Sequence, residues 1–290
     1  MAGYQYVRPT SLDEAIAILA EHGPAARLLT GGTDLIVRLH LGHIRPTVVV
    51  DVKRLEALNT GIQATRDHVR IGARTVMTDV IADPDVQALF PGLVEAASVV
   101  GSVQIRNRAT LAGNICNASP AGDTPPALLV YGAIVIVAGP AGERRVPLHE
   151  FFIGPGKTVL ARGELVIAIE LPRPTERTGA AFGRITRRKG VDLATINLVV
   201  LVAESGTTRA AFGAVAPTPM LVSDTTGDLG ANQPDVDVRN NAIARLVGQA
   251  RPITDVRGSR EYRQAMLHVM TERAWTRAVE QLRHKESQPR

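Results

Sequence analysis

The chain has 290 residues, of which 45% are hydrophobic and 21% are charged, so it is long enough to form two or three globular domains with a sizeable interior. A formal net charge of +5 does not indicate a nucleic-acid partner, because the basic residues are scattered and only 3% of the residues are aromatic, too few for a base-stacking platform. The sequence has no run of about 18 apolar residues and no apolar signal core. We therefore expect a cytoplasmic protein without a membrane span.

Cysteine and histidine usage excludes most metal chemistry from this chain. Cys116 is its one cysteine, so the chain alone builds no disulfide, zinc cluster or iron–sulfur cluster. We interpret this cysteine as a small packing residue rather than a reactive thiol. The seven histidines are dispersed, and His40 and His43, spaced i, i+3 at a predicted helix end, are interpreted as surface or capping residues. Neither an HExxH motif nor a GxSxG elbow supports a hydrolase.

The first predicted element is a helix that begins after Ser11 and ends near Gly23. Ser11 and Glu14 have the S-x-x-E spacing of a capping box. The apolar residues that share one face of this helix are Leu12, Ala15, Ile16 and Leu19. A β-branched run from Thr47 to Val52 then predicts a buried strand. The region is therefore predicted to be a small parallel α/β unit.

Between these elements, LLTGGTDLIVRL from Leu28 to Leu39 predicts a strand, a glycine turn and a helix that begins at Asp34. Gly31 and Gly32 allow consecutive amides to point at one oxyanion, and a helix N-terminus favours a phosphate. The Asp34 carboxylate would repel a phosphate, so we expect it to cap the helix or to meet a polar group of a ribose or flavin. The alternative is a tight strand-to-helix turn without a ligand, since the Rossmann and Walker spacings are both absent.

The middle of the chain alternates short strands and helices. A hairpin is predicted from Ile62 to Gly72, short helices from Thr78 to Val100, and strands near Ala133 to Ala138 and Glu164 to Leu171. Between them lies ATLAGNICNASPAGD, from Ala109 to Asp123, which combines small residues with short polar side chains. Gly113 can adopt backbone angles closed to other residues. The side chains able to bind phosphate or ribityl oxygens are those of Thr110, Asn114, Asn117 and Ser119.

A last unit is predicted after LPRPTERTG, from Leu171 to Gly179, where two prolines break secondary structure. Antiparallel strands are predicted over Ala180 to Ile185, Thr195 to Ala203 and Arg209 to Ala216, followed by a loop with the sequence SDTTGDLGANQPD. Two helices follow, the last from about Ser259 to Leu282. The residues expected to pack this helix on the sheet are Tyr262, Met266, Val269 and Met270.

Together, TGGTDL and ATLAGNICNASPAGD resemble the two FAD-binding segments of the medium, flavoprotein subunit of molybdenum hydroxylases, the xanthine dehydrogenase and carbon monoxide dehydrogenase family. The resemblance extends to SLDEAIAILAEHG, RPTVVVDVKRLEALN, VGSVQIRNRATLAGN, RRKGVDLATINLVVLV and AAFGAVAPTP. It implies an α+β fold in which a two-subdomain, PCMH-type FAD-binding fold, like that of vanillyl-alcohol oxidase and MurB, precedes a C-terminal α+β domain of the carbon monoxide dehydrogenase flavoprotein type. The implied domains are 1–55, 56–175 and 176–290.

The resemblance also implies which residues contact FAD. The first segment, which wraps the pyrophosphate, comprises Leu29, Thr30, Gly31, Gly32, Thr33, Asp34 and Leu35. The second contributes Thr110, Gly113, Asn114, Ser119 and Asp123. Val100 corresponds to a position near the flavin ring that can carry an aromatic residue in the family, so its aliphatic side chain predicts no ring stacking. Val166 or Ile167 corresponds to an apolar flavin contact. Arg184, or its neighbour Gly183, falls where relatives often carry a flavin-contacting lysine, and an arginine charge there would stabilise reduced, anionic flavin.

The sequence leaves two alternative roles for two groups of basic residues. Arg106 and Arg108 flank the second segment, and the last domain begins with Arg184, Arg187, Arg188 and Lys189. They are either solvated surface residues or contacts to FAD phosphates, an acidic partner subunit or an incoming dinucleotide.

The function implied by the resemblance is electron transfer. A large subunit with a molybdenum cofactor oxidises substrate, a small subunit with two [2Fe-2S] clusters relays electrons, and FAD on this chain passes them to NAD, a quinone, oxygen or another carrier. The subunits are expected to form a dimer of heterotrimers, and GGTDL mildly favours xanthine dehydrogenase-like members. The rival hypotheses are a self-sufficient FAD oxidoreductase of the MurB or vanillyl-alcohol oxidase type and a flavin-free assembly protein.

Overall fold

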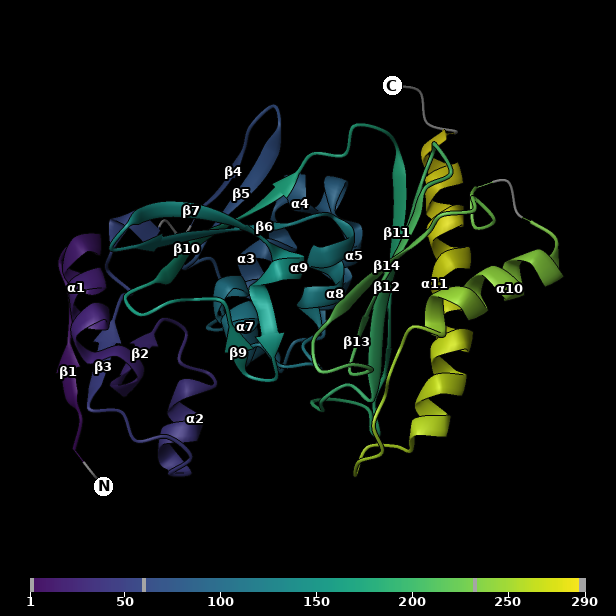
Figure 1. The fold of residues 1–290 in the computed structure, drawn as a ribbon. Coiled ribbons are helices and arrows are strands. Elements are labelled where there is room, and N and C mark those ends of the chain that lie inside the picture. Colours follow the sequence, from purple (N-terminus) through teal and green to yellow (C-terminus); the bar gives the residue numbers. More distant parts are fainter. Residues whose placement is uncertain (1–2, 59–60, 232–233, 287–290) are drawn as a thin grey trace.

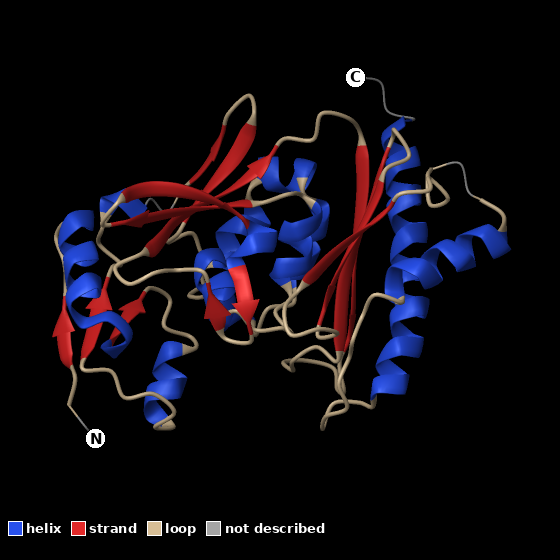
Figure 2. Cartoon of the chain, viewed as in Figure 1, coloured by secondary structure: helices blue, strands red, loops and turns tan. Residues whose placement is uncertain are grey.

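The computed structural model describes residues 3–58, 61–231 and 234–286. Within these residues the strands form sheets of three, five, four and two strands. Figure 1 shows the three-stranded sheet at the N-terminal end of the molecule and the four-stranded sheet at the opposite end, with the five-stranded sheet and short helices between them. Figure 2 shows the same view by secondary structure and confirms the mixed helix and sheet fold. None of the described helices is long and apolar enough to cross a membrane.

The N-terminal sheet is parallel, with strand order β1-β3-β2, as the sequence predicts. Its strands are β1 (Gln5–Val7), β2 (Ala26–Leu29) and β3 (Val48–Asp51). All four residues of β3 are buried, which explains the unbroken apolar run. The helix α1 (Leu12–His22) begins as expected, since Ser11 Oγ accepts a hydrogen bond from Glu14 N at 3.1 Å, and it ends at Gly23 with a φ of 50°. The turn η1 (Gly23–Ala25) connects α1 to β2.

The five-stranded sheet is antiparallel, with order β4-β5-β10-β6-β7. Its strands are β4 (Ile62–Ala64), β5 (His68–Gly72), β6 (Ile134–Gly139), β7 (Gly142–Pro147) and β10 (Leu165–Pro172). The predicted hairpin is confirmed, because β4 pairs with β5 and Ile62 lies opposite Ile71. The central strand β10 carries a bulge between Val166 and Ala168. A bulge re-aims the neighbouring side chains, and this one lies beside the cavity described below.

Short elements lie between the strands of these two sheets along the chain. They are η2 (Glu56–Leu58), α2 (Leu35–His40), α3 (Met77–Ala82), α4 (Pro84–Leu89), α5 (Pro91–Ser98), α6 (Val103–Arg106), α7 (Leu111–Cys116), α8 (Thr124–Val130), α9 (Leu148–Phe151), β8 (Phe152–Gly154) and β9 (Lys157–Thr158). The helices α3, α4 and α5 confirm the run of short helices predicted between residues 78 and 100. Prolines begin α4 and α5, where a missing N–H costs nothing.

The C-terminal sheet is antiparallel and keeps chain order. It consists of β11 (Thr178–Ile185), β12 (Ile196–Ala203), β13 (Thr208–Gly213) and β14 (Met220–Asp224). Helices cover both faces: α11 (Arg260–Glu286) lies on one face, and α5 and α8 lie on the other (Figure 1). On β12, Val199 packs into the core shared with α5 and α8, whereas its neighbours Leu198 and Val200 pack into the core under α11. This double coverage explains the continuous apolar run in β12.

Two boundaries in this region differ from the sequence prediction. The strand expected to reach Ala216 ends at Gly213, because Ala214 has a φ of 62° and turns the chain. The loop expected to begin at Ser223 begins after Asp224, since both residues belong to β14. Residues 232 and 233 of that predicted loop lie outside the described residues.

The predicted packing face of the last helix is partly wrong. Tyr262 is 47% exposed, while Met266 and Met270 lie at the edge of the core. The buried residues of the helix are Arg263, Leu267, Thr271, Ala274, Trp275, Ala278, Val279 and Leu282. The sequence pattern misleads here because one charged residue, Arg263, occupies the buried side of the first turn. The other terminal helix, α10 (Val236–Val247), contacts α11 (Figure 1).

Candidate functional site

A cavity of about 690 Å³ lies where both glycine-bearing segments meet the C-terminal domain. The first segment contributes every residue from Thr30 to Leu35 to its wall. The second segment and its flanks contribute Ala109, Thr110, Ala112, Gly113, Asn114, Cys116, Asn117, Ser119, Ala121, Gly122 and Asp123. Val100 and Val166 also line it, Val166 next to the β10 bulge. The chain thus brings together most of the predicted site residues, although 80 or so residues separate the segments in sequence.

Three predicted site residues do not line the cavity. Leu29 and Ile167 are buried in the hydrophobic core beside it. Arg184 lies behind the wall, where its Nε atom is 3.1 Å from Asp123 Oδ1. The cavity wall also contains residues that the sequence did not single out for this site, among them Arg27 and Arg38. Their only sequence signal is position, because Arg27 directly precedes the LLTGGTDL run and Arg38 follows Asp34 by one helical turn.

The first segment turns sharply through its two glycines. Gly32 has a φ of 75°, which favours glycine, and a Cβ atom at Gly31 would overlap the backbone carbonyl of Arg108. Asp34 occupies the N-cap position of α2 but makes no capping hydrogen bond. The expected cap does not form because the Asp34 backbone is helical rather than extended. Asp34 Oδ1 instead accepts a hydrogen bond from Asn117 Nδ2 at 3.4 Å, which joins the two segments.

The second segment is held by its own short side chains. Thr110 Oγ1 accepts a hydrogen bond from Gly113 N at 3.0 Å and caps α7. Asn114 Oδ1 accepts one from Thr124 Oγ1 at 2.7 Å, which fixes the start of α8. Ala118 has a φ of 47° and turns the chain after α7. Backbone amides and small polar groups therefore form this wall, with little side-chain bulk.

Asp123 is a buried carboxylate on the cavity wall, 8% exposed. Asn197 Nδ2 donates to Asp123 Oδ1 at 2.9 Å, and the Arg184 guanidinium is close to the same oxygen. Burial raises the pKa of Asp123 to about 6, although Arg184 and Asn197 both favour the charged form. Arg184 also donates to the carbonyl oxygens of Val99 and Asp192. Its positive charge is therefore largely balanced within the protein.

Charges of both signs line the rest of the cavity, where Asp34 and Asp192 lie among three arginines. Arg27, Arg38 and Arg188 line it. Burial and, second, the neighbouring Arg38 lower the pKa of the Arg27 guanidinium. Two like charges that repel each other are stabilised when an anion binds beside both of them.

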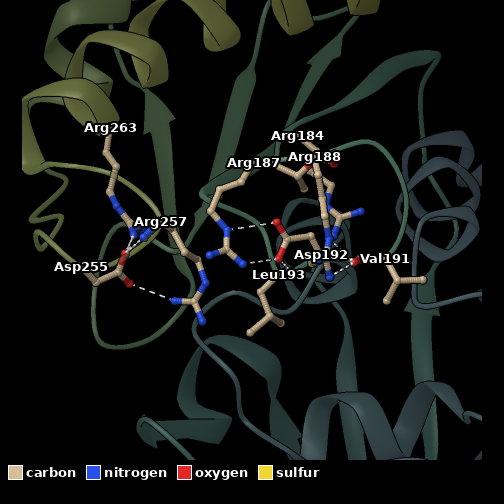
Figure 3. Close-up of polar contacts among 10 residues, drawn as sticks. Arg184, Arg187, Arg188, Val191, Asp192, Leu193, Asp255, Arg257 and Arg263 are labelled. Atoms are coloured by element: carbon tan, nitrogen blue, oxygen red, sulfur yellow. Dashed lines mark hydrogen bonds and ion pairs between the residues drawn. The ribbon is translucent and has the colours of Figure 1, made fainter.

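The loop after β11 forms the C-terminal side of the cavity with Arg188, Val191, Asp192 and Leu193. Figure 3 shows how arginines hold this loop: Arg187 Nη2 lies 2.8 Å from Asp192 Oδ1, and Arg188 Nη2 donates to Val191 O at 2.9 Å. The hydrogen bonds from Arg187 lower the pKa of Asp192 to about 2. The basic residues at the start of the last domain therefore have different roles: Arg187 forms an ion pair within the loop, whereas Arg188 lines the cavity. The structure brings Gly183 to neither the cavity wall nor the loop.

The remaining candidate residues carry no metal site. Cys116 lines the cavity, and burial raises the pKa of its thiol to about 12, as expected for a packing residue. His40 and His43 are both exposed, as predicted. Among the described residues no three histidine, cysteine or carboxylate side chains gather in a way that could hold a metal ion.

Comparison with known proteins gives the family. A model described as "FAD binding domain in molybdopterin dehydrogenase" matches residues 2–174, and one described as "CO dehydrogenase flavoprotein C-terminal domain" matches residues 181–278. The carbon monoxide dehydrogenase medium chain of Hydrogenophaga pseudoflava is 34% identical over 95% of this chain and 98% of its own length. A putative xanthine dehydrogenase FAD-binding subunit of Escherichia coli is 33% identical over 94% and 95%.

Solved structures agree. Carbon monoxide dehydrogenase from H. pseudoflava superposes with a TM-score of 0.89 at 33% identity and covers 96% of this chain and 98% of its own. Quinoline 2-oxidoreductase from Pseudomonas putida gives a TM-score of 0.85 at 26% identity, with 96% and 97% covered. The two family models therefore match consecutive parts of the chain, and the relatives match nearly its full length. This chain belongs to the FAD-binding medium subunits of the molybdenum hydroxylase family and is an oxidoreductase subunit.

Proposed function

We propose that this chain binds one FAD in the cavity and serves as an electron-transfer subunit. It accepts electrons from [2Fe-2S] clusters of a small subunit, which receive them from a molybdenum subunit, and passes them to an external acceptor. The observation that carries the proposal is the meeting of the two glycine-bearing segments in one cavity wall, where Asn117 of the second contacts Asp34 of the first. An unrelated pair of tight turns would have no reason to share a cavity.

The cavity fits FAD in size and chemistry. Its volume of about 690 Å³ suits a large cofactor. A Cβ atom at Gly31 would overlap the Arg108 backbone, and one at Gly32 would crowd the Leu29 side chain, so both positions carry no side chain. Their backbone amides are then available to pyrophosphate oxygens. Arg27 and Arg38 supply the positive charge that a pyrophosphate requires.

The predicted contacts stay part of this proposal. Val100 and Val166 offer apolar surface to the flavin, and the short polar side chains of the second segment offer donors to the ribityl chain. Leu29, Ile167 and Arg184 would support the site from behind the wall. When bound, FAD supplies the redox chemistry through its isoalloxazine ring, and the protein positions it and excludes water.

Two observations support partner subunits: the sequence has a single cysteine, and the relatives are named as subunits of larger dehydrogenases. With one cysteine, the chain has no thiolate set for an iron–sulfur cluster. Its relatives are named as medium chains or FAD-binding subunits of carbon monoxide, xanthine and glyceraldehyde dehydrogenases. We infer a complex with a small iron–sulfur subunit and a large molybdenum subunit, assembled as a dimer of heterotrimers. We also propose domain limits at 1–55, 56–175 and 176–290, which keep the three large sheets apart.

The test is to express the chain alone and with its co-purifying partners, and to record visible spectra and metal content. A flavin band at about 450 nm on the chain, with molybdenum and iron only in the complex, is expected. A colourless chain that takes up no added FAD would overturn the proposal and favour a flavin-free assembly protein. Substrate-dependent flavin reduction by the isolated chain would instead favour a self-sufficient oxidoreductase.

A matched pair of variants tests the placement of the pyrophosphate. Gly32 and Gly42 have similar positive φ angles, 75° and 69°, but only Gly32 lines the cavity. Gly32→Val is expected to abolish FAD retention, whereas Gly42→Val, with no atoms near its Cβ, is expected to keep it. A folded Gly32→Val variant with full flavin content would contradict the placement.

A further inference from the structure

One row of the C-terminal sheet ends at the cavity wall. Arg184 on β11 lies opposite Asn197 on β12, and Asn197 lies opposite Gly213 on β13. This row faces the second glycine-bearing segment at residues 120–123. The C-terminal domain therefore reaches the cavity by way of the sheet as well as through the loop after β11.

Asn197 makes the central contacts of this row. Its side chain is fully buried, and its Nδ2 atom donates to Gly122 O and to Asp123 Oδ1, both at 2.9 Å. Both acceptor residues line the cavity. Among the residues that the structure describes, none hydrogen-bonds the side-chain Oδ1 atom of Asn197. A buried polar group that leaves one atom unsatisfied costs stability, so packing alone would favour an apolar residue of the same size.

The neighbouring residues leave space for Asn197 and keep the same segment in place. A Cβ atom at Gly213 would overlap Asn197 Oδ1, so glycine is required at that position. The next residue, Ala214, donates its backbone N–H to Pro120 O at 2.6 Å. Pro120 is thus hydrogen-bonded to the residue after β13, and Gly122 and Asp123 are hydrogen-bonded to β12.

We propose that Asn197 is a positioning residue for FAD: it holds Gly122 and the Asp123 carboxylate at the cavity wall, so that the C-terminal domain sets the geometry of the cofactor site. The inference rests on the proposed function, since it assigns the cavity to FAD. Asn197 itself does not line the cavity and acts through its two acceptors. A rigid amide suits this role, because one NH₂ group reaches a backbone carbonyl and a carboxylate together.

The charges around Asp123 make the pH dependence of FAD affinity a specific test, because a variant that only lowers the stability of the fold would not change it. Arg184 on β11 faces the carboxylate directly, while Asp34, Arg188 and Asp192 line other parts of the cavity. The hydrogen bond from Asn197 favours the ionised form of Asp123. Its loss shifts the protonation of Asp123, and with it the pH dependence of FAD affinity, to higher pH.

The experiment compares Asn197→Leu with Val200→Ala in the full-length chain. Val200 is a buried residue of the same strand that packs under α11, away from the cavity, so its truncation lowers stability without touching the site. FAD affinity is measured by flavin fluorescence across about pH 5 to 8, together with thermal unfolding of the FAD-free chain. Asn197→Leu is expected to weaken FAD binding about tenfold and to shift its pH midpoint upward. Val200→Ala is expected to bind FAD within about twofold of the parent chain.

Several outcomes decide the proposal. If Asn197→Leu and Val200→Ala bind FAD equally well with unchanged pH midpoints, the positioning role is wrong while the proposed function stands. If the parent chain binds no FAD, both proposals are overturned. If Asn197→Leu does not fold, Asn197→Ser replaces it, because serine fits the same space with a shorter donor. Asn197→Ser is also expected to weaken FAD binding.

A double variant tests whether Asn197 acts through Asp123. In the Asp123→Asn background, Asn197→Leu is expected to weaken FAD binding less than in the parent chain, because the two residues act together. Additive losses would contradict the proposal.

Discussion

The backbone of Gly31 packs directly against the backbone of Arg108, so closely that a Cβ atom at Gly31 would overlap the Arg108 carbonyl oxygen. Gly31 lines the cavity with the first segment, and Arg108 directly precedes the second segment, which begins at Ala109. This contact therefore sets the spacing between the first segment and the second. Unlike Gly32, Gly31 is required for this close approach rather than for a positive φ.

Gly31→Ala is expected to push the two segments apart. A methyl group has no room against a backbone carbonyl, and overpacking of this kind costs about 1–3 kcal/mol of unfolding free energy. The displaced wall should also lose FAD. Urea unfolding and flavin content measure both effects. Gly154→Ala is the matched control, because no atom lies within 4 Å of a Cβ there and its φ is ordinary. Equal stability and flavin content in the two variants would show that the close approach does not matter.

Local sequence features predicted the elements that local chemistry determines. The Ser11 cap, the glycine turn before α2 and the buried run of β3 depend on neighbours within one turn or strand, and the structure confirms each. The pairing of the two glycine-bearing segments required the family resemblance. Nothing in either segment alone specifies a partner about 80 residues away.

The missed features depend on contacts between distant elements. The hydrogen bonds of Asn197 reach partners that lie 74 and 75 positions away in the sequence. No local sequence pattern predicts such contacts. Asp34 carried a good capping side chain, yet the backbone conformation set by the glycine turn prevented the cap. The buried face of α11 was mispredicted because Arg263 belongs to it. A charged residue in a helix is normally expected to face solvent.

Arg263 is expected to be essential for stability. It is 2% exposed, and its Nη1 atom donates to Thr195 O at 2.8 Å and to Ala214 O at 2.9 Å, while Nη2 pairs with Asp255 (Figure 3). Arg263→Leu leaves these acceptors without their donor and is expected to cost about 3 kcal/mol in urea unfolding. Arg273→Leu, at an exposed position of the same helix, should change stability by about 0.5 kcal/mol or less. Similar losses in both variants would argue against a specific role for Arg263.

Cys116 is expected to react slowly with alkylating reagents. Cys116 is partly buried at the cavity wall, and burial raises the pKa of its thiol to about 12, so near neutral pH the reactive thiolate is scarcer than for an ordinary cysteine. The chain has one cysteine, which makes the signal unambiguous. Iodoacetamide labelling followed by mass spectrometry, with the denatured chain as control, measures the rate. Native labelling as fast as that of the denatured chain would contradict the role of Cys116 as an unreactive packing residue.

Asp123 is expected to give the FAD-free chain a distinct pH dependence. Burial raises its pKa from 3.8 to about 6, so between these values the folded chain holds a proton that the unfolded chain has released. Stability from this group is therefore present at low pH, falls by about 3 kcal/mol as pH rises through this window, and stays level above it. Asp123→Asn removes this titration and leaves Arg184 in place.

The measurement that isolates this effect is urea unfolding of the parent chain and Asp123→Asn from about pH 4.5 to 7.5. Subtracting the two curves cancels the other carboxylates, including Asp51, Glu170 and Asp192, whose pKa values are lowered and which act with the opposite sign. The parent chain should lose stability relative to the variant up to about pH 6 and then run parallel to it. A relative gain with rising pH would mean that Arg184 and Asn197 outweigh burial, and Asp123 would then be ionised throughout the working range of the protein.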